Sequence, residues 1–149
     1  MSHIDALLHC VDEQSALLDD FIQTLQAEGQ LLLETPSDEA LGTLTSRKND
    51  YARRLSELDQ DRSRQLAELG FSDTHDSIEA ACKAHPKLRK AFESLWQQAS
   101  EAQALNTQNG QILHTFIEHN QRALDTLRML MGQDLYDARG KLPRHHPAG

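Results

Sequence analysis

The placement of proline constrains this chain more than any other feature of its sequence. The four prolines stand at positions 36, 86, 143 and 147, so residues 37–85 and 87–142 contain none. Because proline removes a backbone donor and clashes inside a helix, these two intervals are where long helices are allowed. Only 5% of the residues are aromatic and only seven are glycine, too few for a fold with many turns. We therefore expect an all-α protein, and neither a β-sandwich, a barrel nor a doubly wound α/β enzyme.

The first long helix is expected at about residues 3–34. Apolar residues recur there at every seventh position, at Ile4, Val11, Leu18, Leu25 and Leu32. Ser2 is a suitable N-cap. Pro36 disfavours helical geometry in the residue before it, so the helix should end near Glu34.

A second long helix is expected at about residues 38–69, with Ser37 as its N-cap. Its apolar stripe alternates steps of three and four through Leu41, Leu44, Lys48, Tyr51, Leu55, Leu58 and Arg62. We expect Lys48 and Arg62 to keep their stems on this seam while their charged heads reach water. Gly70 followed by Phe71 is typical of a left-handed C-cap with a hydrophobic contact.

A short connector helix is expected at about 76–84, and Pro86 fits the first position of the longest helix, at 87–131. The rhythm of threes and fours persists there through Leu88, Phe92, Leu95, Ala99, Ala102, Asn106, Asn109, Leu113, Phe116, Asn120, Ala123, Leu127 and Leu130. Three such helices predict an antiparallel bundle with coiled-coil packing and the longest helix C-terminal. Residues 1–135 should form this single domain, and 136–149 a flexible tail.

Helix lengths point to the functional region. At about 1.5 Å per residue, the last helix should exceed its partners by roughly 20 Å. We place this surplus near residues 116–131, a stretch that contains Phe116, Ile117, Leu124, Leu127, Met129, Leu130 and Met131. An apolar stripe without a partner in its own chain marks an interaction surface. The alternative is that the methionines complete an intramolecular core.

Asparagine recurs on the predicted seam of the last helix, at Asn106, Asn109 and Asn120, and Gly110 follows the second of these. Buried amides fix helix register at some expense of stability, whereas glycine inside a helix costs about 1 kcal/mol relative to alanine. Two interpretations stay open. One is a register lock with a close helix approach at Gly110, and the other is a soft point at which the helix bends or repacks against a partner.

Charge argues against nucleic-acid binding, since the net charge is −8. Residues 1–46 hold nine acidic residues and no Lys or Arg, which is either a solvated face or a surface that selects a basic partner.

No apolar run exceeds three residues, so we expect no membrane insertion. The N-terminus lacks the basic start of a signal peptide, and a cytoplasmic location is expected.

Catalytic and metal-binding motifs are missing from the sequence. His114 and His119 are five residues apart, which does not place them on one helical face. Cys10 and Cys82 fit no metal or redox spacing and should pack as small apolar residues in a reducing compartment. The seven glycines are too scattered for a phosphate-binding loop. We expect neither an enzyme nor a cofactor.

Two motifs resemble the FlgN family of flagellar export chaperones. They are Asn106-x-x-Asn109-Gly110 with Ile112-Leu113 in the last helix, and Tyr136-Asp137-Ala138-Arg139-Gly140 in the tail. The resemblance implies a cytosolic chaperone that holds the terminal segments of the hook–filament junction proteins FlgK and FlgL and delivers them to the type III export gate. It places client binding in the C-terminal helix. The candidate client contacts are Asn109, Gly110, Leu113, Phe116, Ile117, Asn120, Leu124, Leu127, Leu130 and Met131.

Tyr136 and Gly140 are candidates for a second contact, with the export machinery, although Tyr136 also fits a simple hydrophobic contact with the last helical turn. The competing hypothesis for the whole protein is a coiled-coil structural or adaptor protein that associates with itself through the same surplus helix. The sequence leaves open whether the chain is a monomer or a dimer, and what the acidic first helix does.

Overall fold

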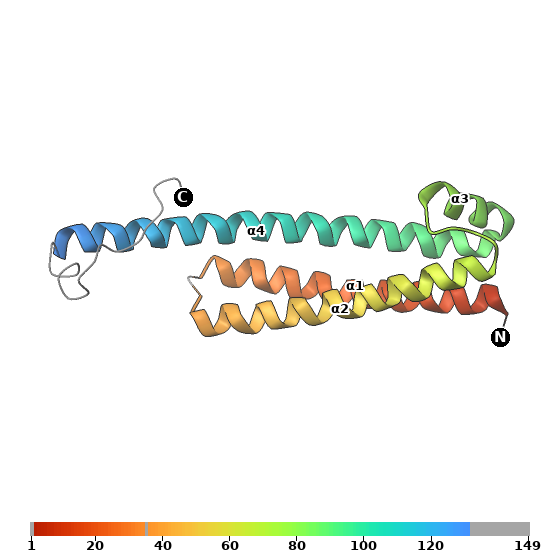
Figure 1. Ribbon diagram of the computed structural model, residues 1–149, viewed down its shortest axis with the longest axis horizontal. Coiled ribbons are helices and arrows are strands. Elements are labelled where there is room, and N and C mark those ends of the chain that lie inside the picture. The colour runs from red at the N-terminus through yellow and green to blue at the C-terminus, as the bar shows by residue number, and fades with distance from the viewer. Residues whose placement is uncertain (1, 35, 132–149) are drawn as a thin grey trace. The chain divides into compact units, whose positions relative to one another are not determined.

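The computed structural model describes residues 2–34 and 36–131, without the side chains of residues 116, 119, 120, 123 and 131. Its elements are α1 (His3–Leu32), α2 (Asp38–Glu68), α3 (His75–Ala84), a short 3₁₀ turn (Pro86–Leu88) and α4 (Arg89–Met131) (Figure 1). These described ranges contain no strand, and the all-α prediction is confirmed. The expected spans 3–34, 38–69, 76–84 and 87–131 differ from these bounds by at most two residues at either end. The expected tail, 136–149, lies outside the described residues.

Hydroxyl side chains begin three of the helices. Ser2 Oγ accepts a hydrogen bond from the Asp5 N–H, and Ser37 Oγ accepts one from the Ala40 N–H. Thr74 caps α3 in the same way. Each cap satisfies one of the backbone donors that have no partner inside the helix, so the sequence itself determines where these helices begin.

Gly70 ends α2. Its φ of +86° is left-handed, its N–H donates to the Ala67 carbonyl at 3.0 Å, and the Phe71 N–H donates to the Leu66 carbonyl at 2.9 Å. These two bonds form the Schellman motif, which satisfies carbonyls at the end of the helix. The predicted C-cap is confirmed.

Replacing Gly70 with alanine should lower the free energy of unfolding by about 1–2 kcal/mol, because a Cβ disfavours left-handed geometry. Gly42→Ala is the matched control. Gly42 lies inside α2 with open space where a Cβ would stand, so this change should raise stability by about 1 kcal/mol. Urea denaturation followed by circular dichroism measures both values. Equal effects of the two substitutions would contradict this interpretation of Gly70.

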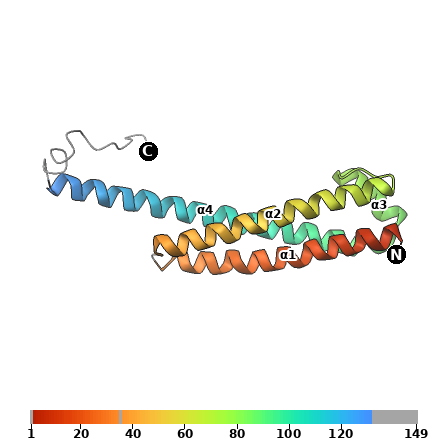
Figure 2. The same cartoon turned by 60° about the horizontal axis from the view of Figure 1, so that its bottom comes forward.

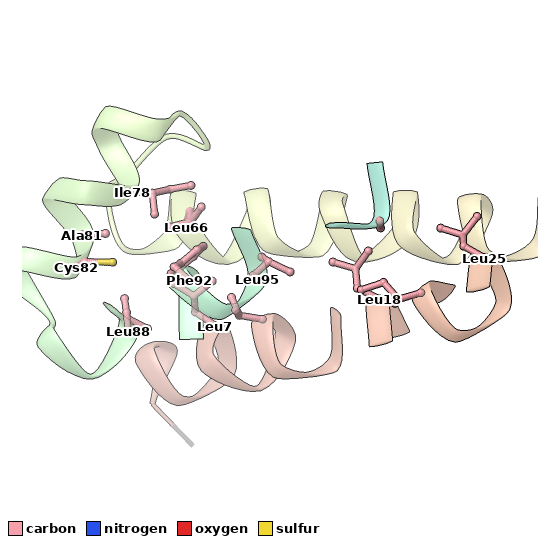
Figure 3. Packing of buried hydrophobic residues seen from close by; sticks show 13 residues of the cluster. Leu7, Leu18, Leu25, Leu66, Ile78, Ala81, Cys82, Leu88, Phe92 and Leu95 are labelled. Carbon is pink, nitrogen blue, oxygen red and sulfur yellow. The ribbon is translucent and has the colours of Figure 1, made fainter. Parts of the chain in front are cut away.

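The chain divides into two units, Met1–Asn109 and Gly110–Gly149, and α4 contributes to both. Within the first unit, α1 and α2 lie side by side and antiparallel (Figures 1 and 2). The core of this unit draws on all the helices and on the 3₁₀ turn. Figure 3 labels ten of its side chains: Leu7, Leu18, Leu25, Leu66, Ile78, Ala81, Cys82, Leu88, Phe92 and Leu95. The largest fully buried side chain is Phe92 of α4.

The two cysteines belong to the buried part of this unit. Burial, followed by the negative charge of Asp61, raises the pKa of the Cys10 thiol to about 11. Burial likewise raises the pKa of the Cys82 thiol. Both cysteines are free and buried, as expected for small packing residues, and the Cys10 thiol also donates a hydrogen bond to the Leu58 carbonyl at 3.7 Å.

Neither thiol should react with a disulfide reagent at about pH 8 while the protein is folded, because the thiolate is the reactive form and Cys10 remains protonated well below its pKa. Both should react at once in denaturant. Titration with Ellman's reagent, with and without urea, measures this difference. Rapid reaction of the folded protein would show that one of these positions opens readily.

Candidate functional site

Burial changes along α4 at Asn109. The side chains that α4 buries are Phe92, Leu95, Ala102 and Asn109. Of the side chains described from Gly110 to Leu130, none is buried. The same helix therefore contributes first to the core of one unit and then carries side chains that are half-buried or exposed.

The part of α4 after Asn109 carries an apolar stripe. This stripe consists of Leu113, Ile117, Leu124 and Leu127. At 3.6 residues per turn these four positions fall within a sector roughly 80° wide, and Met129 falls on the opposite side. Leu113 is half-buried, whereas Ile117 is 55% and Leu127 53% exposed. Exposed apolar side chains gathered on one helix face are uncommon on a protein with no binding partner.

Other predicted contact residues lie in the same part of α4. Leu130 lies about 60° outside the sector of the stripe and is exposed. Phe116, Asn120 and Met131 belong to the helix, but their side chains are outside the described ones. Tyr136 and Gly140 also lie outside the described residues.

A buried polar junction closes the first unit at Asn109, which is 4% exposed. Its amide nitrogen donates to the Leu25 carbonyl at 2.7 Å and to Glu28 Oε1 at 2.9 Å. Lys48 Nζ lies 3.3 Å from both oxygens of the Glu28 carboxylate. Glu28 is itself buried, so the charge of Lys48 and the Asn109 amide compensate for the removal of its carboxylate from water.

Gly29 provides the room that Asn109 occupies. A Cβ at position 29 would lie 3.1 Å from Asn109 Oδ1, whereas a Cβ at Gly110 would meet nothing within 4 Å. The close helix approach expected at Gly110 is therefore wrong, because the approach is at Gly29. The expectation that Asn106 lies on the buried seam is also wrong, since Asn106 is exposed.

The charged heads on the α2 seam form ion pairs, a feature that the stripe pattern did not predict, and both side chains remain partly exposed. Lys48 contacts Glu28 as described. Arg62 is 17% exposed and donates to Asp59, Asp73 and Gln14. Two helices and the segment before α3 thus meet at one guanidinium.

Sequence reasoning missed Gln14 and Glu28, the two buried polar side chains of α1. The sequence does contain a pattern that indicates both residues. Counting in sevens from Leu7 reaches Gln14 and Glu28, so they occupy the same helical face as a core leucine. Polar residues at such positions require partners, which here are Arg62 and Lys48.

The described residues contain no group of three His, Cys, Asp or Glu side chains that could hold a metal ion. No helix among them has the length and apolar character needed to cross a membrane. What they offer is a helical core, a polar junction and an apolar stripe on one helix.

These features define a helical protein with an apolar helix face suited to binding other proteins. The chain belongs to the FlgN family, because the model of the FlgN protein family matches residues 1–144. Two relatives, from Salmonella typhimurium and Salmonella typhi, are each named Flagella synthesis protein FlgN. Each is 24% identical to this chain over 145 residues, which cover 96% of this chain and 94% of the relative. No solved structure matches the chain.

Membership confirms the family that the sequence motifs indicated. FlgN is a flagellar chaperone family and not an enzyme family, which agrees with the prediction of a non-enzymatic protein. A chaperone family implies protein clients.

Proposed function

We propose that this protein is a cytoplasmic type III export chaperone. It binds amphipathic terminal segments of the hook–filament junction proteins FlgK and FlgL through the C-terminal part of α4, and keeps them soluble and competent for export. The observation that carries this proposal is the exposed apolar stripe of α4, in a chain that belongs to a flagellar chaperone family.

The stripe suits an amphipathic client helix. Anchors spaced by three, four and seven residues are the pattern with which such a helix packs against a groove or another helix. The stripe offers this spacing at Leu113, Ile117, Leu124 and Leu127. Ordering a disordered client segment costs about 2–5 kcal/mol of the gross interaction energy, which keeps the complex dissociable, as delivery requires.

Further residues complete the proposed client surface. Gly110 stands at its beginning, and the rest of the proposed set is Phe116, Asn120, Leu130 and Met131. Asn109, also a candidate client contact from the sequence, is instead buried against Leu25 and Glu28. Asn106, Asn109 and Gly110 form the motif that is similar to the family pattern. In this proposal Tyr136 and Gly140 provide a second contact, with components of the export gate.

Self-association through the same stripe is the second candidate function, and the same exposure favours it, because two apolar helix faces can cover each other. Light scattering over a range of concentrations separates the two. A monomer that forms one-to-one complexes with client segments supports the chaperone, whereas a dimer that client segments do not dissociate supports the adaptor.

Truncation after residue 112 tests the proposed function. The shortened chain should lose binding to the terminal segments of FlgK and FlgL in isothermal titration calorimetry. Circular dichroism and a thermal melt should show that the first unit remains helical and cooperative, since its core lies within residues 1–109. Undiminished binding by a folded truncated chain would overturn the proposal.

A further inference from the structure

A groove of about 420 Å³ lies between α1 and α2, and these two helices alone line it. Its α1 wall consists of Glu13, Ala16, Leu17 and Asp20. These residues are three, four and seven positions after the first, so they occupy one helical face. The apolar pair Ala16 and Leu17 is at the centre of this face, and a carboxylate stands at each end.

The α2 wall repeats the same spacing with Arg54, Glu57, Leu58 and Asp61. Leu58 is its apolar residue and is half-buried, while Leu17 across the groove is 5% exposed. Because Leu17 is almost fully covered, the apolar floor of the groove is small and consists of the exposed Ala16 and the half-buried Leu58, between charged rims. Its volume lies in the range of binding pockets, which is room for a few side chains of a docked helix.

The charge of the groove is strongly negative, with four carboxylates and one guanidinium. On the α2 wall Glu57 pairs with Arg53 and Asp61 with Arg64. On the α1 wall neither Glu13 nor Asp20 forms an ion pair within the described part of the chain, so these two carboxylates are available to a partner. The unit that contains the groove, residues 1–109, has nineteen acidic residues and ten Lys or Arg. This surplus attracts a positively charged partner over several ångströms and repels a negatively charged one.

We propose that the groove binds a basic amphipathic helix of a partner protein. Apolar side chains of that helix pack on Ala16 and Leu58, and its Lys or Arg side chains pair with Glu13 and Asp20 on the α1 rim. Charge excludes the other occupants. A second copy of this unit would place carboxylates against carboxylates, and nucleic acids and anionic lipids carry the same sign as the groove. The site is separate from the apolar stripe of α4, and therefore goes beyond client binding.

Two synthetic peptides of about five helical turns test this inference on the full-length protein. The first has leucines along one face and lysines on both flanks. The second has the same composition in an order that destroys the apolar face. Fluorescence anisotropy should show that the first binds about tenfold or more tightly than the second, and that added salt weakens its binding. Backbone NMR shifts should change in residues 13–20 and 54–61.

Neutralising the rims with E13Q, D20N, E57Q and D61N should weaken binding of the first peptide by about tenfold or more, because the attraction is lost while the floor remains. The matched control is D12N, E34Q, E93Q and E101Q, which changes net charge equally at exposed positions outside the groove. It should keep the affinity within about threefold. Circular dichroism checks that both variants remain folded.

The inference is overturned if the first peptide does not bind, if the scrambled peptide binds equally well, or if the control variant loses as much affinity as the groove variant. Shift changes confined to residues 110–131 would also overturn it, since the peptide would then be using the client surface. The groove variant should retain its affinity for FlgK and FlgL segments, so failure here leaves the proposed chaperone function standing.

Discussion

Replacing Ile117 and Leu124 together with aspartate should lower the affinity for flagellar client segments by at least about a hundredfold. Burial of a side chain of this size against a client contributes roughly 1.5–3 kcal/mol, and two such losses correspond to a factor of this order. An aspartate in the contact must also lose its water, which adds to the loss. Both side chains are exposed in the free protein, so its fold should not change.

Met129→Asp is the matched control for this pair. Met129 is 82% exposed, lies on the same part of α4 and faces away from the apolar stripe. Its replacement should leave client affinity within about threefold, because exposed positions away from a contact contribute little. Isothermal titration calorimetry measures the affinities, and circular dichroism checks the helix content. An equal loss at Met129 would mean that general charge or hydrophobicity, and not the stripe, determines binding.

Asn109→Leu should lower the free energy of unfolding by about 2–3 kcal/mol. The substitution removes the amide that donates to Glu28 Oε1, and leaves a buried carboxylate with Lys48 as its remaining partner. A buried charged acceptor that loses a hydrogen bond is costly. Urea denaturation measures the effect.

Asn106→Leu is the control that separates burial from residue type. Asn106 is exposed, three positions before Asn109 on the same helix, so its replacement should change stability by less than about 0.5 kcal/mol. Replacing all three members of the junction, as in E28L, K48M and N109L, should recover most of the lost stability, because an apolar set of similar volume needs no compensation. If Asn109→Leu were as harmless as Asn106→Leu, the polar junction would have no energetic role.

The comparison of these two asparagines also shows which structural features the sequence predicts and which it does not. Both fit the steps of three and four that predict the helix, because that pattern is a local property of α4. Only Asn109 meets Glu28, which is 81 positions away, and Gly29, which leaves it room. Whether a particular residue is buried depends on this tertiary arrangement. The spacing of residues along one helix does not predict it.

The ion pairs of Lys48 and Arg62 were not predictable from the α2 stripe for the same reason. Periodicity correctly locates them on the α2 seam, but their partners come from α1 and from the segment before α3. Solvent exposure is the usual outcome for such side chains when no partner is near. The counterparts are recognisable only when the polar residues at the core positions of α1, Gln14 and Glu28, are considered together with them.

The apolar residues after Gly110 are evident in the sequence, since helix length and composition both single them out. Whether a partner within the chain covers them is a question of packing. In the structure the described members are half-buried or exposed. The acidic groove, by contrast, needs the pairing of α1 with α2 before its two walls can be seen as one site.

The absence of buried side chains among those described from Gly110 to Leu130 bears on the lifetime of the chain in the cell. A helix of this length that depends mainly on its own backbone hydrogen bonds opens easily in water. Local opening is what exposes a chain to proteases, and under the proposed function a bound client would suppress it by covering the helix. Degradation would then begin in this part of α4 when clients are scarce and slow down when they are abundant. The amount of the protein would in this way follow the supply of its clients without a separate regulator.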